Sequence, residues 1–287
     1  MKLWLSIAGL TWLTLIRVPA QVSVEVVLDQ EQFLPSEAVP VAVHIINLSG
    51  QPLHLGAEAN WLTFDVESAD SFVVIRNSEV PVQGEFDLES SQMATKRVDL
   101  EPYFVMSRPG RYNVTATVHI KAWGKDITST PRTFDVVHGA QLWSQDFGLP
   151  GTTNGAPTVR RYSLEEANYL RSQLRLYVQV SDASEGQVFK VSAIGPLVGF
   201  SRPETQLDRS NNLHVLYQSS AHLFTYSVVN PDGNVMRSDT YDFFNSRPRL
   251  SVDELGDVSV LGGVRRPEPG ELPLVKPPNE ATIPAKP

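Results

Sequence analysis

One stretch of the sequence occurs twice and constrains the fold of the C-terminal half more than any other feature. Residues 201–218 read SRPETQLDRSNNLHVLYQ, and residues 246–263 read SRPRLSVDELGDVSVLGG. Aligned without a gap, the copies share Ser-Arg-Pro, an aspartate (Asp208 and Asp253) and a Val-Leu pair. Each copy predicts a strand, a polar turn and a second strand. We therefore expect this half of the chain to be built from repeated β-hairpins.

The copy that begins at Ser201 continues into further strands. Three runs rich in β-branched and aromatic residues follow the first strand, at 213–217, 223–229 and 235–243. Residues 230–233 read NPDG, which is a turn signal between the last two runs. Four strands in about 45 residues is the dimension of a propeller blade. The repeat therefore resembles the blades of secreted bacterial propellers.

About three such units fit into residues 140–266. Closed propellers use roughly four to eight blades, so we expect an unclosed arrangement of about three propeller-like repeats. Its open end would be covered by the N-terminal part of the chain or by a second subunit of a homo-oligomer. The first unit is a weak copy that contains Ser163 and Glu166 in a capping-box spacing. This spacing predicts a short helix at 163–170.

The N-terminal part has the strand rhythm of a β-sandwich. Strands are expected at 22–26, 39–45, 61–66, 72–75, 98–100 and up to about 137. The most specific stretch is RPGRYNVTATV at 108–118, a Pro-Gly turn followed by a strand that carries Tyr112. It resembles the corner of Greek-key sandwiches, in which the tyrosine hydroxyl bonds back to the backbone. Residues 21–138 resemble bacterial immunoglobulin-like and macroglobulin-like extracellular domains, which implies an all-β fold with an immunoglobulin-like sandwich.

The remaining segments are distinguished by their composition. Residues 1–20 combine Lys2, an apolar run and small residues before Gln21, which predicts a signal peptide rather than an uncleaved membrane anchor. Residues 139–155 predict a Gly/Pro-rich linker before a propeller-like β-repeat domain at 156–264. Residues 265–287 are rich in proline and predict a disordered tail.

Charge and cysteine content narrow the classes of function. The net charge is −8, which argues against nucleic acid as a partner, because nucleic-acid binders need a basic face. The sequence after the signal peptide has no apolar run long enough to span a membrane. The chain has no cysteine, and an exported protein of this size without disulfides is typical of bacteria. We therefore expect a periplasmic or extracellular bacterial protein.

Five residues are candidates for ligand contacts: Trp123, Arg202, Asp208, Arg247 and Asp253. The two aspartates are ligand or calcium contacts in one interpretation. In the other, which their recurrence favours, they are turn residues that accept backbone N–H bonds. The two arginines are anion contacts or, as we expect, partners of acids in the neighbouring unit. Trp123 is expected to be exposed at a hairpin tip, where an aromatic ring stacks on a sugar or anchors a protein.

No metal or cofactor is expected. None of the six histidines belongs to a zinc motif, although His214 and His222 lie in one repeat, and no P-loop, dinucleotide fingerprint or nucleophile elbow is present. We expect an exported, non-catalytic binding or scaffold protein with a protein or glycan partner. An extracellular enzyme acting on glycans or another polymer is the alternative. A proteinase inhibitor is a second alternative, for which residues 79–93 are the best loop, although they predict a flexible segment.

Overall fold

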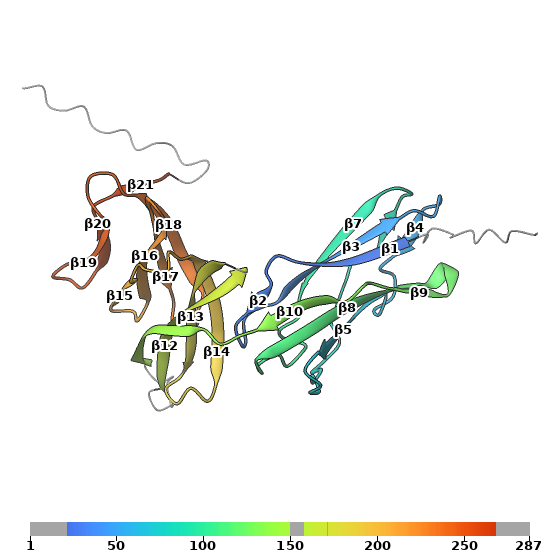
Figure 1. Ribbon diagram of the computed structural model, residues 1–287, viewed down its shortest axis with the longest axis horizontal. Helices are drawn as coiled ribbons and strands as arrows, with labels where there is room; N and C mark the ends of the chain where they lie inside the picture. Colours follow the sequence, from blue (N-terminus) through green and yellow to red (C-terminus); the bar gives the residue numbers. More distant parts are fainter. Residues whose placement is uncertain (1–21, 150–157, 171, 268–287) are drawn as a thin grey trace, which may run out of the picture.

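The computed structural model describes residues 22–149, 158–170 and 172–267. Apart from one 3-10 turn, η1 (Lys121–Trp123), its regular structure is β-strand, so the all-β prediction is confirmed for these residues. The sheets gather into an N-terminal lobe, residues 22–137, and a C-terminal lobe, residues 140–267 (Figure 1). The described residues contain no helix that could cross a membrane. The expected signal peptide and residues 268–287 of the expected tail lie outside the described residues.

Two main sheets face each other in the N-terminal lobe. One has the strand order β1-β3-β7, and the other has the order β2-β10-β8-β5 with β9 paired to β8. A short two-stranded sheet, β4-β6, completes the lobe. The strands are β1 (Val22–Leu28), β2 (Gln32–Phe33), β3 (Pro40–Asn47), β4 (Leu53–Leu55), β5 (Leu62–Ser68), β6 (Phe86–Leu88), β7 (Met93–Asp99), β8 (Gly110–Ile120), β9 (Lys125–Thr128) and β10 (Arg132–Val136).

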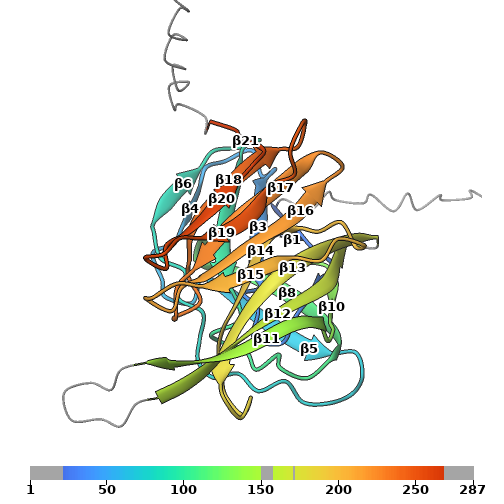
Figure 2. The same ribbon diagram turned by 90° about the vertical axis from the view of Figure 1, so that its left-hand side faces the viewer.

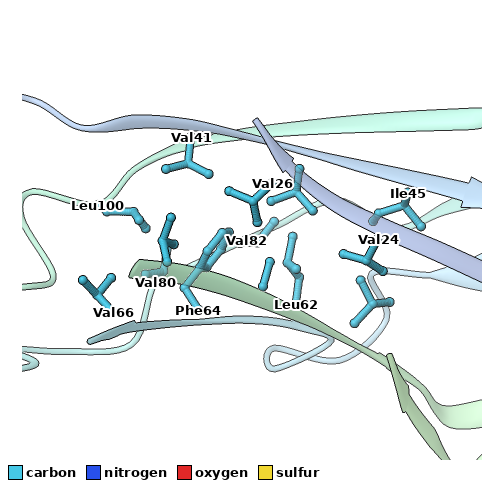
Figure 3. Close-up of a cluster of buried hydrophobic side chains, with 14 of the residues drawn as sticks. Val24, Val26, Val41, Ile45, Leu62, Phe64, Val66, Val80, Val82 and Leu100 are labelled. Carbon is cyan, nitrogen blue, oxygen red and sulfur yellow. The ribbon is translucent and has the colours of Figure 1, made fainter. Parts of the chain in front are cut away.

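The core of this lobe follows from alternation along the strands. In β3 every second residue from Val41 to Ile45 is buried, and the residues between them are only half-buried. β5 contributes Leu62 and Phe64 from the opposite sheet. Figure 3 shows these two sets of side chains meeting between the sheets. The period of two in the sequence therefore correctly marks the faces that are buried.

Tyr112 is the corner residue that the sequence indicates. Its side chain is fully buried and stacks on Phe134, with the ring centroids 5.5 Å apart. Its hydroxyl donates a hydrogen bond to the carbonyl oxygen of Arg108 at 2.6 Å. Burial raises the pKa of the Tyr112 hydroxyl. The predicted bond back to the backbone is thereby confirmed.

The strand expected at 72–75 is absent. Phe72 and Val74 are packed against the core while Val73 and Ile75 are exposed, so the alternation itself is present. The only pairing in this region is an isolated bridge between Arg76 and Phe104. Alternation without a ladder of partners does not make a strand.

Residues 79–93 are not the flexible loop that the sequence predicts. Val80 and Val82 are buried in the core, and β6 pairs with β4. The indole nitrogen of Trp61 donates to the carbonyl oxygen of Val82 at 2.9 Å. Apolar burial and this hydrogen bond hold the segment against the lobe.

The C-terminal lobe consists of three antiparallel sheets. The first has the order β11-β12-β13-β14, the second has the order β15-β16-β17-β18-β21, and the third is the hairpin β19-β20. Figure 1 places this hairpin at the end farthest from the N-terminal lobe. The strands are β11 (Ala140–Leu149), β12 (Thr158–Leu170), β13 (Gln173–Asp182), β14 (Val188–Pro196), β15 (Glu204–Leu207), β16 (Leu213–Ser220), β17 (Leu223–Val229), β18 (Val235–Asp242), β19 (Arg249–Val252), β20 (Val258–Leu261) and β21 (Val264–Arg265).

The repeated stretch adopts the same structure twice. Residues 201–218 contain the hairpin β15-β16, and residues 246–263 contain the hairpin β19-β20. Each turn is closed by a residue with positive φ, which is Asn211 at 60° in the first copy and Gly256 at 81° in the second. The four strands expected after Ser201 are all present as β15 to β18. The predicted hairpins are confirmed.

Two expectations for this half of the chain are wrong. Residues 163–170 are not a helix but part of β12, which pairs with both β11 and β13. Tyr162 and Leu164, two positions apart, enter the core, and the two ladders outweigh the weak local preference of one capping box. The expected linker 139–155 contains β11, so the C-terminal sheets begin at Ala140 rather than at residue 156.

Two buried tyrosines join the first two sheets. The hydroxyl of Tyr162 on β12 donates to the carbonyl oxygen of Asn211, in the β15-β16 turn, at 3.0 Å. The hydroxyl of Tyr217 on β16 donates to the carbonyl oxygen of Ile194 on β14. Gly195 has a φ of +140°, and a Cβ there would lie 2.5 Å from the Tyr217 hydroxyl. The contact between the sheets therefore requires glycine at this position.

The N-terminal lobe covers the outer face of the first sheet. Leu34, which follows β2, packs there against Ala167, Tyr177 and Val191. The amide nitrogen of Glu31 donates to the carbonyl oxygen of Tyr169 on β12 at 2.9 Å. Apolar contact and a backbone bond thus connect the two lobes.

A buried carboxylate lies at this junction. Glu37 accepts hydrogen bonds from Gln30 Nε2 at 2.9 Å and from the amide nitrogen of Leu34 at 2.8 Å. Arg175 of β13 donates to the side-chain oxygen of Gln30 at 2.6 Å, and its positive charge also lowers the pKa of Glu37. Burial raises the pKa of Glu37, and these hydrogen bonds oppose the shift without cancelling it.

Replacing Tyr112 by phenylalanine removes the bond to Arg108 and keeps the ring. We expect Tyr112→Phe to lower the free energy of unfolding by about 1 kcal/mol, the net contribution of one hydrogen bond. Urea unfolding followed by tryptophan fluorescence measures the loss. Tyr103→Phe is the control, because the described residues give the Tyr103 hydroxyl no hydrogen bond. Equal losses in both variants would contradict the role of the corner.

Glu37→Gln tests the carboxylate at the lobe junction. The folded-state pKa of Glu37 is raised above its ordinary value of 4.5, so the folded chain binds more protons than the unfolded chain in the window above pH 4.5. The contribution of Glu37 to stability therefore falls as pH rises through that window. We expect the wild type to lose stability relative to Glu37→Gln between pH 4.5 and pH 7, measured by urea unfolding. The exposed Glu25 supplies the control, Glu25→Gln. A wild type that gains stability relative to Glu37→Gln as pH rises from 4.5 to 7 would refute the prediction.

Candidate functional site

A cleft of about 490 Å³ opens on the C-terminal lobe. Its lining comes from residues 141–143 of β11, from β12, and from residues 199–203, which lead from the first sheet to the second. β11 and β12 lie side by side along one margin of this lobe (Figure 2). Of the five candidate residues, Arg202 is the one that lines the cleft.

A β-bulge shapes the β11 side of the cleft. Gln141, Leu142 and Trp143 all belong to the lining, although successive side chains of a regular strand point to opposite faces. The pairing of β11 with β12 shifts between Gln141 and Trp143, which leaves Leu142 without a partner. A bulge of this kind bends a strand and changes the direction of its side chains.

Two aromatic rings belong to the lining. Phe200 is 90% exposed, although a phenylalanine is usually buried. Trp143 is half-buried and packs against the core between the first two sheets, so its position is fixed while part of it stays accessible. Accessible aromatic faces of this kind bind flat, partly apolar groups by stacking.

The lining also carries one acid and one base, and neither has a partner. Glu166 is half-buried and Arg202 is exposed, and no side-chain hydrogen bond or ion pair joins either of them to another described residue. Other arginines of this lobe differ, since Arg160, Arg161 and Arg266 form ion pairs at 2.9, 2.6 and 2.6 Å. The cleft therefore holds two charges that are free to meet a ligand.

Two uncharged polar groups add to the lining. The hydroxyl oxygen of Ser201 is buried and has no hydrogen-bond partner among the described residues. Gln141 Nε2 donates to the hydroxyl oxygen of Ser144 at 3.0 Å, which orients the Gln141 side chain. The lining thus combines neutral polar residues with charges and aromatic rings.

The two recurring arginines are not equivalent, and among the residues that the structure describes neither forms the expected ion pair with an acid of the neighbouring unit. Arg202 lies at the cleft, whereas Arg247 lies over the ring of Phe224, 5.2 Å from its centroid. The difference arises because the second copy packs on the second sheet, where Leu250 and Val260 join the cluster that contains Phe224.

Asp208 and Asp253 both act as turn residues. One carboxylate oxygen of Asp208 accepts hydrogen bonds from the amide nitrogens of Ser210 and Asn212, both at 2.8 Å. Asp253 accepts the corresponding bond from the amide nitrogen of Asp257 at 2.8 Å. The turn interpretation of these residues is confirmed.

Asp208 has further partners that Asp253 lacks. Its second oxygen accepts a bond from Asn212 Nδ2 at 2.8 Å and lies 3.2 Å from His214 Nε2, while His214 Nδ1 lies 2.6 Å from the hydroxyl of Tyr226. Burial raises the pKa of Asp208, but the hydrogen bonds outweigh it and hold the pKa below its ordinary value. His214 is thus tied to a turn, and the described residues contain no group of three or more metal ligands.

Trp123 is not the exposed residue that the sequence predicts. It ends η1, is half-buried and packs against the N-terminal core. Gly124 follows with a φ of 56°, and this left-handed residue reverses the chain so that the indole lies on the lobe. The exposed ring of the protein's cleft is Phe200 instead.

Sequence motifs do not identify most of the residues that line the cleft. The sequence predicts Glu166 in the cap of a helix and Trp143 in a linker, so neither residue is expected in a binding site. The one available signal is Gly199-Phe200, an aromatic residue beside a glycine in the loop that precedes the repeated Ser-Arg-Pro. Large apolar residues in surface loops often mark binding sites.

Alanine at the two turn aspartates should have unequal effects. Asp208→Ala removes four hydrogen-bond contacts and Asp253→Ala removes one. We expect the free energy of unfolding to fall by about 2 kcal/mol in the first variant and by less than about 1 kcal/mol in the second. Urea unfolding measures both values. Equal losses would show that the additional contacts of Asp208, with the amide nitrogen of Ser210, Asn212 Nδ2 and His214 Nε2, contribute nothing.

The comparisons with known proteins leave the site to be interpreted from its own residues. No protein-family model matches the chain, and no curated protein matches it. Among solved structures, the chain is similar to the sporulation control protein Spo0M from Bacillus subtilis, with 11% sequence identity and a TM-score of 0.32, over 59% of this chain and 83% of that chain. An identity and a TM-score this low carry no argument about function.

Proposed function

We propose that the protein is an exported, non-catalytic binding protein that holds a glycan in the cleft of β11, β12 and residues 199–203. The observation that carries the proposal is the exposed Phe200 in one lining with the fixed Trp143. Sugar rings present C–H faces that stack on aromatic rings, and hydroxyl groups that need hydrogen-bond partners. Glu166 and Arg202 supply unsatisfied partners in the same cleft.

Export is supported by the sequence. Residues 1–20 have the pattern of a signal peptide, the chain lacks cysteine, and its net charge is −8. A periplasmic or extracellular protein with these features meets glycans and other envelope polymers.

The two lobes would act as the scaffold for this site. Two facing sheets and the corner bond of Tyr112 support an immunoglobulin-like sandwich in the N-terminal lobe. The recurring hairpins support propeller-like repeats in the C-terminal lobe. Both architectures serve many functions, so the assignment rests on the cleft and not on the fold.

The lining favours binding over the two alternatives. Most glycoside hydrolases place two carboxyl groups on either side of the bond that is cut. Among the residues that line the cleft, Glu166 is the one acid. Proteinase inhibition needs a protruding loop, and the segment 79–93 instead buries Val80 and Val82 in the core.

A glycan array probed with residues 21–287, followed by calorimetry on the best ligand, tests the proposal. We expect Trp143→Ala and Phe200→Ala each to weaken binding about tenfold, because each removes a stacking surface. Phe244→Ala is the matched control, since Phe244 is an exposed aromatic residue outside the lining. An array without binding, or an equal loss in the control variant, would refute the proposal.

A further inference from the structure

We propose that the glycan unit held in this cleft carries both a cationic and an anionic group, the first bound by Glu166 and the second by Arg202. The inference rests on the proposed glycan site and adds the charge pattern of its ligand. The cation would be a free amine, and the anion a carboxylate or a phosphate.

Glu166 is half-buried, and no side-chain hydrogen bond or ion pair joins it to another described residue. A carboxylate that is partly removed from water costs free energy unless it is paired or hydrogen-bonded. Asp239 of the same lobe shows the usual solution: it is buried, and it accepts bonds from Arg237 at 2.5 Å and from Arg265 at 3.0 Å. Glu204 likewise accepts a bond from the amide nitrogen of Leu250 at 2.9 Å. Glu166 has no such partner among the described residues, so it is available to a cation.

The backbone that carries Arg202 is constrained. Because it precedes Pro203, its backbone is confined to the extended region. Two backbone hydrogen bonds anchor the loop before it. The amide nitrogen of Ser201 donates to the carbonyl oxygen of Val198 at 2.9 Å, and the amide nitrogen of Val198 donates to the carbonyl oxygen of Gln218 at 3.0 Å. A planar guanidinium on such a base suits the two oxygens of a carboxylate or phosphate.

The two charges belong to one cleft and yet do not pair with each other. A ligand that satisfies both side chains must therefore carry opposite charges at two points. A neutral sugar would leave both unsatisfied, and an acidic sugar without an amine would be repelled by Glu166.

A series of sugars with the same ring tests the contribution of each charge in turn. N-acetylglucosamine carries neither charge, glucosamine carries the amine, N-acetylmuramic acid carries the carboxylate, and muramic acid carries both. Glucosamine 6-phosphate replaces the carboxylate by a phosphate. Ligand-observed NMR titrations of residues 21–287 at pH 6.5 and low salt give the dissociation constants. We expect the sugar with both charges to bind at least about tenfold more tightly than either singly charged sugar, and the two zwitterions to show which anion is preferred.

Variants assign each charge to its residue. Glu166→Gln should lower the affinity for muramic acid to that for N-acetylmuramic acid, and Arg202→Ala should lower it to that for glucosamine. Arg202→Lys keeps a positive charge and should recover part of the loss. Arg249→Ala is the control, because Arg249 is an exposed arginine outside the lining, and it should leave every affinity unchanged.

The outcomes separate this inference from the proposed function. Equal affinities for all the sugars would overturn the charge pattern while the glycan site stands. A preference for the doubly charged sugar that persists in both Glu166→Gln and Arg202→Ala would also overturn it, because other residues would then bind the charged groups. If the array binds only neutral glycans, the inference fails alone. If the array and the titrations are both blank, the glycan site fails with it.

Discussion

The central sheets of the C-terminal lobe are apolar on both faces, and each face has to be covered. In β16 the consecutive residues from Leu213 to Tyr217 are all buried, which requires packing on both sides of the strand. The first sheet covers one face of the second sheet, and the hairpin β19-β20 covers the other. The first sheet has the same requirement, which the N-terminal lobe meets through Leu34. The order of the layers therefore follows from the burial of apolar surface, which drives folding.

Polar groups inside these layers fix how the layers are aligned. The hydroxyls of Tyr162 and Tyr217 each reach a backbone carbonyl of the neighbouring sheet, and Glu37 is bonded at the junction of the lobes. Each such bond contributes little net free energy, but a buried polar group left without a partner is costly. Alternative alignments of the layers would break these bonds, so they select one arrangement among the many that apolar contact alone would allow.

The cleft arises where this regular packing is interrupted. The bulge at Leu142 breaks the alternation of β11, and the loop between the first and second sheets brings Phe200 and Arg202 to the same lining. Elsewhere in the lobe, arginines and acids neutralise each other, as in the pair Arg161 and Asp146. A site that leaves aromatic and charged groups unsatisfied gives up some stability in the free protein, and such local costs are typical of binding sites.

The sequence by itself determined the features that depend on a few neighbouring residues. Strand alternation, the repeated hairpins, the turn role of Asp208 and the corner bond of Tyr112 are all of this kind, because turn chemistry and the period of two act locally. Only the tertiary structure decided that 163–170 is a strand, since its ladders with β11 and β13 join distant parts of the chain. The same holds for the burial of Trp123 and for the cleft, whose lining residues meet only after the sheets have stacked.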